Sequence, residues 1–460
     1  MYNVKKVNED LYWIGASDRR LALFENIYPI PRGVSYNSYV ILDEQTVLLD
    51  TVDKAVSGQF FENLEHVLGE RKLDYIIVNH MEPDHCAIVE EVVRRYPEVK
   101  VVGNAKTFTM MKQFFTFDVD AHAVVIKEGD TISTGKHTLA FAMIPMVHWP
   151  EAMVTYDAYD KVLFSADAFG TFGALNGNVF ADEVNFKEEW LDDARRYLVN
   201  IVGKYGVQVQ AALKKALTLD IAMICPLHGP IWREDLGWFI EKYQKWSTYT
   251  PEDHNVLILY ASIYGNTENA ADVLAGKLAD AGEKNIAVYD VSVTDPSYLV
   301  AEAFRCDRIV FACPTYNAGL FPKMETLLHE LAAHNLQKRK VAVLENGTWA
   351  STAGKQMKEI LSSMKNMEIC ENTVTVKANK KVCIRATNAV TISRKAGTLT
   401  ADMFQVSGEN AELQFDVKED AENASLTVSG SLDEANTQVV DGSIVKVSEK
   451  GAFGIGTGVT

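Results

Sequence analysis

Residues 75–86 read YIIVNHMEPDHC, an apolar run followed at once by four side chains that can bind a metal ion. The run 75–78 predicts a buried strand, and the pattern CAIVEEVVRRY over residues 86–96 predicts a helix. The polar side chains therefore crowd one strand-to-helix loop, a common place for a functional site in an α/β fold. The candidate ligands in this loop are His80, Glu82, Asp84 and His85.

Three further apolar runs end in side chains of the same kinds. AFAMIPMV runs into His148, KVLFSA into Asp167 and IAMICPL into His228. Because parallel strand ends share one rim in a layered α/β fold, we expect all seven groups to converge. Imidazoles and carboxylates together suit a pair of first-row metal ions, which a carboxylate can bridge. A lone histidine at a strand end is more often a hydrogen-bonded polar residue, but seven groups at four strand ends favour metal.

Composition excludes several classes of protein. With 45 Lys and Arg against 62 Asp and Glu, the formal charge is −17, which repels a phosphate backbone, so nucleic acid is not an expected partner. No apolar run approaches the roughly 20 residues of a membrane helix, and the first residues lack the apolar core of a signal peptide. We therefore expect no membrane association and a cytoplasmic location. The six cysteines form no C-x-x-C pair, and we expect buried, reduced thiols, not disulfides or a built-in rubredoxin.

The length of 460 residues predicts two or three domains, and a polar stretch over residues 247–255 indicates a boundary. We expect one domain over residues 1–250, a second over 251–378 and a tail over 379–460. The tail contains no Trp, Tyr, His or Pro, and its Val/Thr/Ser/Gly runs alternate at period two. It reads as short β strands or as a poorly ordered segment of unknown role.

Strict βα alternation in the second domain predicts a parallel, doubly wound sheet. The expected strands are residues 256–262, 286–293, 308–316, 341–349 and 372–378, and the expected helices are residues 266–281, 296–305, 322–333 and 354–364.

Three loops of this domain form a candidate binding site for a phosphate and a flat aromatic ring. The first loop joins a strand to a helix, where backbone N–H groups and hydroxyls can surround a phosphate, although such loops also merely cap helices. The other two loops each carry an aromatic residue with amides or hydroxyls. No G-x-G-x-x-G motif or P-loop is present, so we expect neither NAD(P)H nor ATP to bind by those routes. The candidate residues are Ser262, Tyr264, Gly265, Asn266 and Thr267; Pro314, Thr315, Tyr316, Asn317 and Gly319; and Asn346, Gly347, Thr348 and Trp349.

The metal motif resembles that of the metallo-β-lactamase fold, and Asp50 at the end of the run VLLDT matches the structural Asp of that superfamily. Hydrolases of the superfamily usually carry H-x-H-x-D-H, whereas here Glu82 replaces the second histidine. A carboxylate adds negative charge and a hard oxygen donor, which favours iron over zinc. The H-x-E-x-D-H form, followed by a flavodoxin-like half, resembles the flavodiiron proteins, also called A-type flavoproteins.

This resemblance covers residues 1 to about 378 and implies a fold, two cofactors and a ligand set. The implied fold class is α/β, with a metallo-β-lactamase-like αββα sandwich, a flavodoxin-like doubly wound parallel sheet and an atypical β-rich C-terminal tail. The implied cofactors are FMN, held by the three loops, and two iron ions. The implied ligands are His80, Glu82 and His148 for one iron, Asp84, His85 and His228 for the other, and Asp167 as the bridge.

The resemblance also implies an activity: reduction of O2 to water, of NO to N2O, or of both, with electrons relayed through FMN. The implied electron donor is a rubredoxin-like protein or a reduced deazaflavin, and the implied assembly is a head-to-tail homodimer or a dimer of dimers. Two alternatives remain open. One is a zinc-dependent metallo-β-lactamase-type hydrolase fused to a flavodoxin-like domain, and the other is an electron carrier with a vestigial first half.

Overall fold

The computed structural model describes residues 1–377 in full and the backbone of residues 381–386, 415–417, 425–427 and 452–454. The chain divides into two compact units, residues 1–252 and the part from Asp253 onward. Most of the tail over residues 379–460, with the strands expected there, lies outside the described residues.

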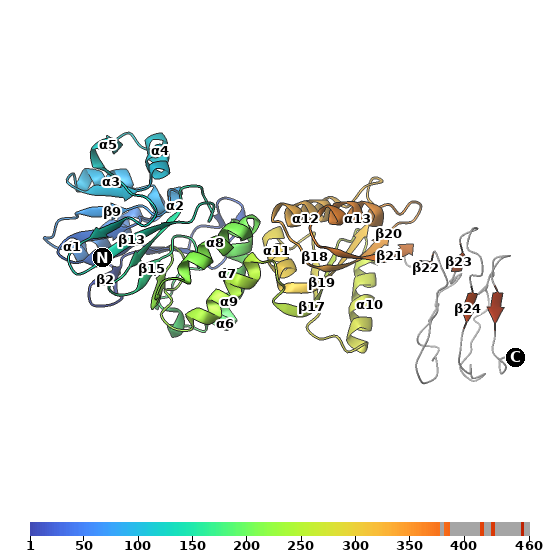
Figure 1. The fold of residues 1–460 in the computed structure, drawn as a ribbon. Helices are drawn as coiled ribbons and strands as arrows, with labels where there is room; N and C mark the ends of the chain where they lie inside the picture. The colour runs from blue at the N-terminus through green and yellow to red at the C-terminus, as the bar shows by residue number, and fades with distance from the viewer. Residues whose placement is uncertain (378–380, 387–414, 418–424, 428–451, 455–460) are drawn as a thin grey trace. The chain divides into compact units, whose positions relative to one another are not determined.

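The first unit contains two sheets packed face to face, with helices on the outside of each (Figure 1). One sheet has seven strands in the order β1-β2-β7-β8-β9-β10-β11. Their bounds are Lys5–Lys6, Leu11–Trp13, Tyr39–Leu42, Thr46–Leu49, Tyr75–Ile77, Lys100–Gly103 and Ala123–Val125. The other sheet has five strands in the order β12 to β16, with bounds Thr131–Ser133, Thr138–Met143, Met153–Asp157, Val162–Phe164 and Met223–Cys225.

Nine α-helices accompany these sheets, α1–α5 beside the first and α6–α9 beside the second (Figure 1). Their bounds are Ser57–Leu68, Pro83–Cys86, Val89–Arg95, Ala105–Phe114, Val119–His122, Phe186–Glu189, Leu191–Tyr197, Gly206–Ala216 and Leu236–Ser247. Two small hairpins pair β3 with β6 and β4 with β5; these strands are Ala16–Asp18, Val34–Tyr36, Leu23–Phe24 and Tyr28–Pro29. Short 3₁₀ or π turns occur at Lys54–Val56, Ala181–Glu183, Leu198–Val202 and Gly203–Tyr205. This is the expected αββα arrangement.

The core of the first unit fixes the loop that carries the metal motif. Ile76, Ile77 and Val78 are at most 1% exposed, because β9 is a central strand between two parallel neighbours. Pro83 occupies the first turn of α2, where its missing N–H is not needed and its fixed φ suits a helix. The strand therefore ends and the helix begins on either side of a short buried loop.

The sheets of the first unit are mixed, which corrects the expectation of parallel strands. β14 runs antiparallel to both β13 and β15, whereas β15 and β16 are parallel. Two reversals restore the direction, so β13, β15 and β16 all point the same way. Their carboxyl ends still share one rim, which is why the three residues that follow them converge.

The second unit is a doubly wound sheet in the order β18-β17-β19-β20-β21, followed by β22 and β23. The first five strands are parallel, and this order is that of the flavodoxin type. The bounds of β17 to β23 are Asp253–Tyr260, Ala287–Asp290, Cys306–Pro314, Lys340–Asn346, Glu368–Lys377, Lys381–Ala386 and Phe415–Val417. Helices α10 to α13 span Asn266–Asp280, Pro296–Arg305, Pro322–Ala333 and Ala353–Ser363. A separate strand pair, β24 and β25, spans Ser425–Thr427 and Ala452–Gly454.

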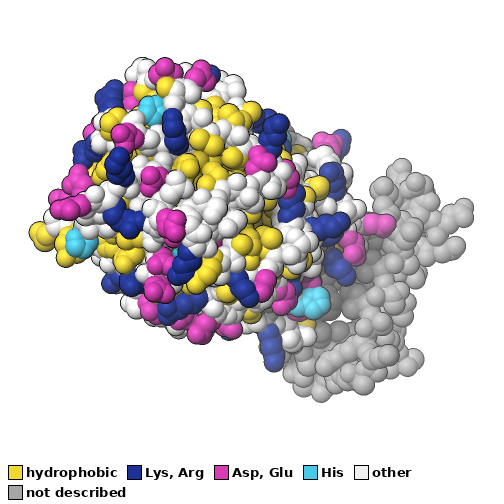
Figure 2. Space-filling model, turned by 60° about the vertical axis from the view of Figure 1, so that its left-hand side comes forward, with side chains coloured by type: hydrophobic (Ala, Val, Ile, Leu, Met, Phe, Trp, Pro, Cys, Tyr) yellow, Lys and Arg dark blue, Asp and Glu magenta, His cyan; other side chains and the backbone are white. Residues whose placement is uncertain are grey.

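The surface carries charges of both signs, and most of the described cysteines are buried. Among the described helices, none is long and apolar enough to cross a membrane. On the face drawn in Figure 2, acidic and basic side chains are interspersed. Cys370 of β21 is exposed, contrary to the expectation of buried thiols. The side chain of Cys383 lies outside the described residues, and the remaining four cysteines are buried and free: Cys86, Cys225, Cys306 and Cys313.

Candidate metal centre and flavin site

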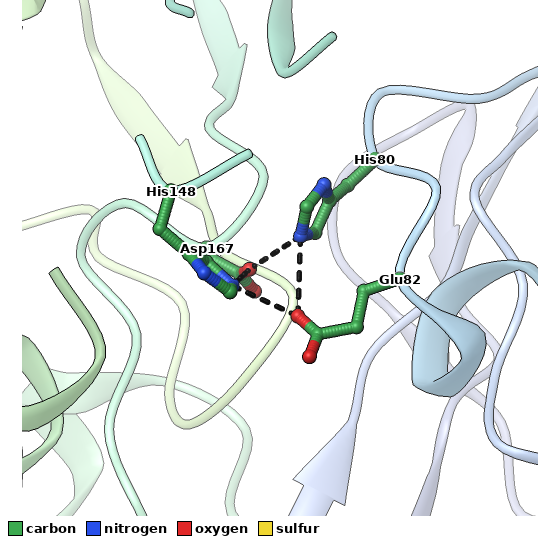
Figure 3. Close-up of side chains that lie close together, drawn as sticks. All are labelled: His80, Glu82, His148 and Asp167. Atoms are coloured by element: carbon green, nitrogen blue, oxygen red, sulfur yellow. Dashed lines mark hydrogen bonds and ion pairs between the residues drawn. The ribbon is translucent and has the colours of Figure 1, made fainter. Parts of the chain in front are cut away.

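The first group of candidate ligands is a buried set of two histidines and two carboxylates (Figure 3). His80 Nε2 lies 3.2 Å from Glu82 Oε2 and 3.1 Å from Asp167 Oδ2. His148 Nε2 lies 2.8 Å from the same Glu82 oxygen and 3.2 Å from the same Asp167 oxygen. Ligands bound at about 2.0–2.2 Å to one ion are about 3 Å apart from one another, so these four atoms have the spacing of a coordination sphere.

The second group lies on the other side of Asp167 and consists of Asp84, His85 and His228. The Nε2 atoms of both histidines lie 3.3 Å from Asp84 Oδ2. They lie 3.3 and 3.6 Å, respectively, from Asp167 Oδ1. Asp167 therefore turns one carboxylate oxygen to each group, which is the arrangement that a bridging ligand needs.

Unsatisfied buried oxygens show that the site fits metal ions. Both carboxylate oxygens of Asp84 and both of Asp167 are buried and accept no hydrogen bond from any residue that the structure describes. A buried polar atom without a partner is destabilising by about 1–3 kcal/mol, and more if it is charged. Four such atoms in one cluster indicate cations as the missing partners, and the mixture of imidazole and carboxylate suits first-row metals.

The electrostatics of the cluster keep the carboxylates ionised. Burial would raise the pKa of Asp167, but the charges of His80 and His85 hold it well below its usual range. Burial by itself would lower the pKa of His148, yet the adjacent carboxylates of Asp167 and Glu82 raise it to about 9. In the metal-free protein, imidazolium protons therefore stand in for the metal charge.

The protons held by the histidine ligands predict that the affinity for metal depends on pH. A metal ligand must be a neutral imidazole, so binding displaces the proton that His148 holds up to about pH 9. We expect the apparent affinity for a divalent metal to rise at least about tenfold per pH unit between about pH 6 and pH 8. A competition titration with a chromophoric chelator measures this slope, and His148→Gln should reduce it. An affinity that does not change over this range would contradict the prediction.

Residues around the ligands fix the orientation of the imidazoles. His80 Nδ1 lies 2.9 Å from Glu151 Oε1, which also accepts a hydrogen bond of 2.8 Å from the backbone N–H of Met81. His228 Nδ1 lies 2.7 Å from the backbone oxygen of Ser35, to which it can donate. In both histidines the outer nitrogen is engaged, so Nε2 points into the cluster.

Asp50 supports the loop without being part of either ligand group. Its two carboxylate oxygens accept hydrogen bonds of 2.7 Å from the backbone and side-chain nitrogens of Asn79, and one of them a third of 3.3 Å from the backbone of His80. This is the structural role expected from the sequence.

Two further carboxylates of this site, Glu25 and Glu151, were not predicted from the sequence. Glu151 is buried and lies three residues after His148, a spacing that alone carries no signal. Glu25 lies against Glu82; burial, the hydrogen bond with Glu82 and the charge of that residue raise the pKa of Glu25 to about 8. Glu25 and Asn26 both have a positive φ, of 49° and 58°, in the turn between β4 and β5, a feature that the sequence does not reveal.

Replacing Glu151 should weaken metal binding through His80. We expect Glu151→Ala to lower the affinity for iron by about 10–100-fold, because the imidazole loses its acceptor and becomes free to turn. Glu151→Gln keeps an acceptor oxygen and should restore most of the affinity. Iron content after dialysis against a chelator measures the effect, with Glu128→Ala, an exposed carboxylate paired with Lys215, as the control. Equal iron retention in Glu151→Ala and the control would show that Glu151 has no such role.

The three predicted flavin loops lie side by side at one edge of the second sheet. They follow β17, β19 and β20, which are neighbours in the sheet, so their carboxyl ends are adjacent. Asn346 of the third loop reaches Thr267 of the first, with 3.4 Å between Nδ2 and Oγ1. From β17 the chain passes first to β18 on one side and then to β19 on the other side of β17. The strand order therefore reverses between β17 and β19, and ligands of such folds bind at this switch point.

The first loop has the geometry of a phosphate cradle. Gly265 has a φ of 84°, and the nearest atom to an added Cβ is 3.8 Å away, so the space above it is open. Gly265 is the N-cap of α10 and has no side chain, and no described side chain caps the helix, so its first N–H groups are available to an anion. Ser262 Oγ accepts a hydrogen bond of 3.0 Å from the backbone of Gly265 and thereby shapes the turn.

The aromatic residues of these loops are free to stack on a planar ring. Tyr264 is 91% exposed, Trp349 82% and Tyr316 42%. Thr315 Oγ1 accepts hydrogen bonds from the backbone N–H groups of Thr352 and Ala353 at the start of α13, which ties the second loop to the third. The remaining predicted residues of the second and third loops lie at the same edge: Pro314, Asn317, Gly319, Gly347 and Thr348.

Comparisons with known proteins agree with this architecture. The family model of the ODP family beta lactamase matches residues 34–229, and that of flavodoxin matches residues 258–382. The anaerobic nitric oxide reductase flavorubredoxin of Vibrio vulnificus is 32% identical over 348 residues, which cover 75% of this chain and 70% of that protein. An uncharacterized protein of Methanocaldococcus jannaschii is 31% identical over 376 residues, which cover 81% of this chain and 93% of that protein.

Solved structures share the fold. Rubredoxin oxygen:oxidoreductase of Desulfovibrio gigas superposes with a TM-score of 0.75 at 27% identity, covering 82% of this chain and 93% of that chain. The flavodiiron protein of Giardia intestinalis, at 24% identity and a TM-score of 0.73, covers 80% of this chain and 92% of its own, and it shows the fold alone.

A metallo-β-lactamase-like metal domain followed by a flavodoxin-like domain defines a class of metal-containing flavoproteins. The chain belongs to one family within that class, the flavodiiron proteins. It is an oxidoreductase, and its cofactors are FMN and a pair of iron ions. The alternative of a zinc-dependent hydrolase is not favoured, because the named relatives are reductases.

Proposed function

We propose that this protein reduces O2 to water, NO to N2O, or both, at a diiron centre that receives electrons through FMN. The observation that supports this most is the cluster of seven ligands divided by Asp167 into two groups. When bound, the irons store one electron each and the flavin two, enough to take O2 and four protons to two waters, or to take two NO and two protons to N2O and water.

We assign the ligands on the distances above. His80, Glu82 and His148 hold one iron, Asp84, His85 and His228 hold the other, and Asp167 bridges them. All of these side chains except the partly buried Asp84 are buried, which excludes bulk water and strengthens their electrostatic interactions. Aromatic rings line the second group, with Phe24, Tyr36 and Tyr197 each within 5.7 Å of the ring of His228. Such a wall admits a small apolar gas more readily than a charged solute.

We assign the FMN phosphate to the loop of residues 262–267, and the isoalloxazine ring to Tyr264, Tyr316 or Trp349. Tyr264 and Trp349 are largely exposed, whereas the ring of Tyr316 also contacts that of Phe321. The carboxyl ends of the strands and the polar groups of residues 314–319 and 346–349 complete the site. We propose that residues 1–250 form the diiron domain and residues 251–378 the FMN domain, which is supported by the division of the chain into compact units after Glu252.

An external donor supplies the electrons in this proposal. Rubredoxin is named in the Desulfovibrio gigas structure, and a rubredoxin-like protein or a reduced deazaflavin fits here. We place the reaction in the cytoplasm, which suits the unpaired thiols. Oxygen-electrode and NO-electrode assays of the iron- and FMN-loaded protein with reduced rubredoxin test the function. No consumption of either gas would reject it.

We further propose a head-to-tail homodimer, or a dimer of such dimers, in which the flavin of one subunit serves the irons of the other. A mixture of two inactive variants, Thr267→Glu without FMN and Asp167→Ala without iron, should then regain activity after subunit exchange. In each mixed dimer one of the two flavin-to-iron junctions is intact, so activity should reach up to about half of that of an intact dimer. Subunit exchange confirmed by native mass spectrometry without any return of activity would favour transfer within one chain.

A further inference from the structure

A small apolar cavity lies between helix α8 and the five-stranded sheet of the first unit. Its volume is about 40 Å³. Three neighbouring strands, β13, β14 and β15, each contribute a side chain to one wall: Ala142, Val154 and Leu163. Val209 and Leu213 of α8 contribute to the opposite wall. All of the elements around this cavity lie within the first unit, which the structure describes in full.

The few polar side chains that line the cavity already have partners. Ser165 Oγ donates a hydrogen bond of 2.6 Å to a backbone oxygen of its own loop. Lys215 Nζ lies 2.8 Å from the backbone oxygen of Met143, to which it donates, so only the aliphatic part of Lys215 is left to cover the cavity. About 10–15 Å³ is room enough for a water molecule, but an apolar cavity without free polar partners stays dry. The space therefore suits a small apolar guest better than water.

The cavity adjoins the two loops that carry His148 and Asp167. Val147, which precedes His148, and Ala168, which follows Asp167, both line it. Burial raises the pKa of Tyr243, and the charge of Asp167 adds to this rise, so this lining residue lies near the bridging carboxylate. The cavity and the metal cluster thus lie on either side of the same two loops.

Small side chains keep this space open. Ala212 and Ala216 lie about one turn apart on α8, and both line the cavity. Voids that can hold a guest are few in a close-packed interior, and a larger side chain at either position would fill this one. Ala211 is the neighbouring residue on the same helix, but it is exposed and does not line the cavity. The helix therefore offers matched positions for filling the cavity and for a control.

We propose that this cavity binds a single molecule of a small apolar gas and supplies it to the metal cluster. The inference rests on the proposed function, because it concerns how O2 or NO reaches the irons. Both gases are uncharged and nearly apolar, so they lose little when they leave water for a dry apolar space. Rotation of buried side chains such as Val147 then lets a diatomic molecule pass the loops of His148 and Asp167.

Xenon is the probe for the site, because it binds in dry apolar cavities and takes no part in the reaction. In crystals of the full-length protein under xenon pressure, we expect a xenon atom between α8 and β14. Ala212→Leu should reduce its occupancy at least about tenfold, whereas the exposed Ala211→Leu should leave it unchanged. Absence of xenon from the cavity of the unmodified protein would overturn the proposal, whichever gas the enzyme reduces.

Steady-state kinetics test whether the cavity supplies the gas to the irons. We expect Ala212→Leu and Ala216→Leu each to raise the KM for the gas at least about fivefold, while kcat at saturating gas and the iron and FMN contents stay unchanged. Ala211→Leu should keep the KM of the unmodified protein. An unchanged KM in both cavity-filling variants would overturn the role in supply. Absence of gas consumption by the unmodified protein would reject the proposed function instead, and the xenon experiment decides the binding site independently of that result.

Discussion

Asp167→Ala should abolish the reduction of both O2 and NO while FMN binding stays intact. The carboxylate faces both ligand groups, with Oδ2 lying 3.1 Å from His80 Nε2 and Oδ1 lying 3.3 Å from His85 Nε2. Its removal takes a ligand from both irons at once. We therefore expect turnover to fall by more than about 100-fold, a larger effect than the loss of a residue that only orients a ligand. Gas consumption, iron content and the flavin spectrum of the purified variant measure the three quantities.

A control separates the loss of the bridge from a general loss of charge in the same domain. Asp160 belongs to a third group of His137, Asp157 and Asp160 that has the spacing of a metal site but is satisfied internally: His137 lies 2.8 Å from Asp157 and 3.3 Å from Asp10. We expect Asp160→Asn to retain iron and activity. Substantial turnover of an iron-free Asp167→Ala protein would show that the metal site is not the reaction centre.

Thr267→Glu should produce a protein that holds iron but no FMN. Thr267 is 1% exposed, on the first turn of α10, where the N–H groups are available to the phosphate. A carboxylate at this position repels a phosphate and occupies its space, so we expect the FMN affinity to fall by at least about 100-fold, or roughly 3 kcal/mol. Fluorescence titration of the apoprotein with FMN measures the affinity.

Two control variants separate a specific loss of FMN binding from a general loss of folding. Thr326→Glu introduces the same side chain at an exposed position of α12 in the same domain and should bind FMN normally. Thr267→Val keeps the shape, removes the hydroxyl and should weaken FMN by a smaller factor. Full FMN occupancy in Thr267→Glu would move the phosphate away from this loop.

Much of the second unit could be predicted from the sequence because its signals are local. The expected helices 296–305 and 322–333 match α11 and α12, each of which begins with a proline at its first turn. The expected strand 372–378 begins four residues after the start of β21, because the first residues of that strand are largely exposed and show no apolar alternation. The tail over residues 379–460 cannot be compared, since most of it lies outside the described part of the chain.

The metal site was predictable to the extent that its ligands follow apolar runs. His80, His148, Asp167 and His228 all come after apolar strands, and the structure brings them together. Strand direction could not be predicted, because periodicity does not reveal which strands pair, and β14 reverses between β13 and β15. Glu151 was missed for a related reason: it lies 71 residues from His80, and their contact depends on the pairing of distant segments.

The central claim is that electrons stored on the flavin reach O2 or NO through the metal cluster. The most direct test reduces the iron- and FMN-loaded protein under anaerobic conditions, mixes it rapidly with either gas, and follows flavin reoxidation together with gas consumption. Our account predicts reoxidation at least about 100-fold faster in the unmodified protein than in Asp167→Ala for the gas that is the substrate. Flavin reoxidation at the same rate in both proteins, with either gas, would contradict the account, because the flavin would then react without the cluster.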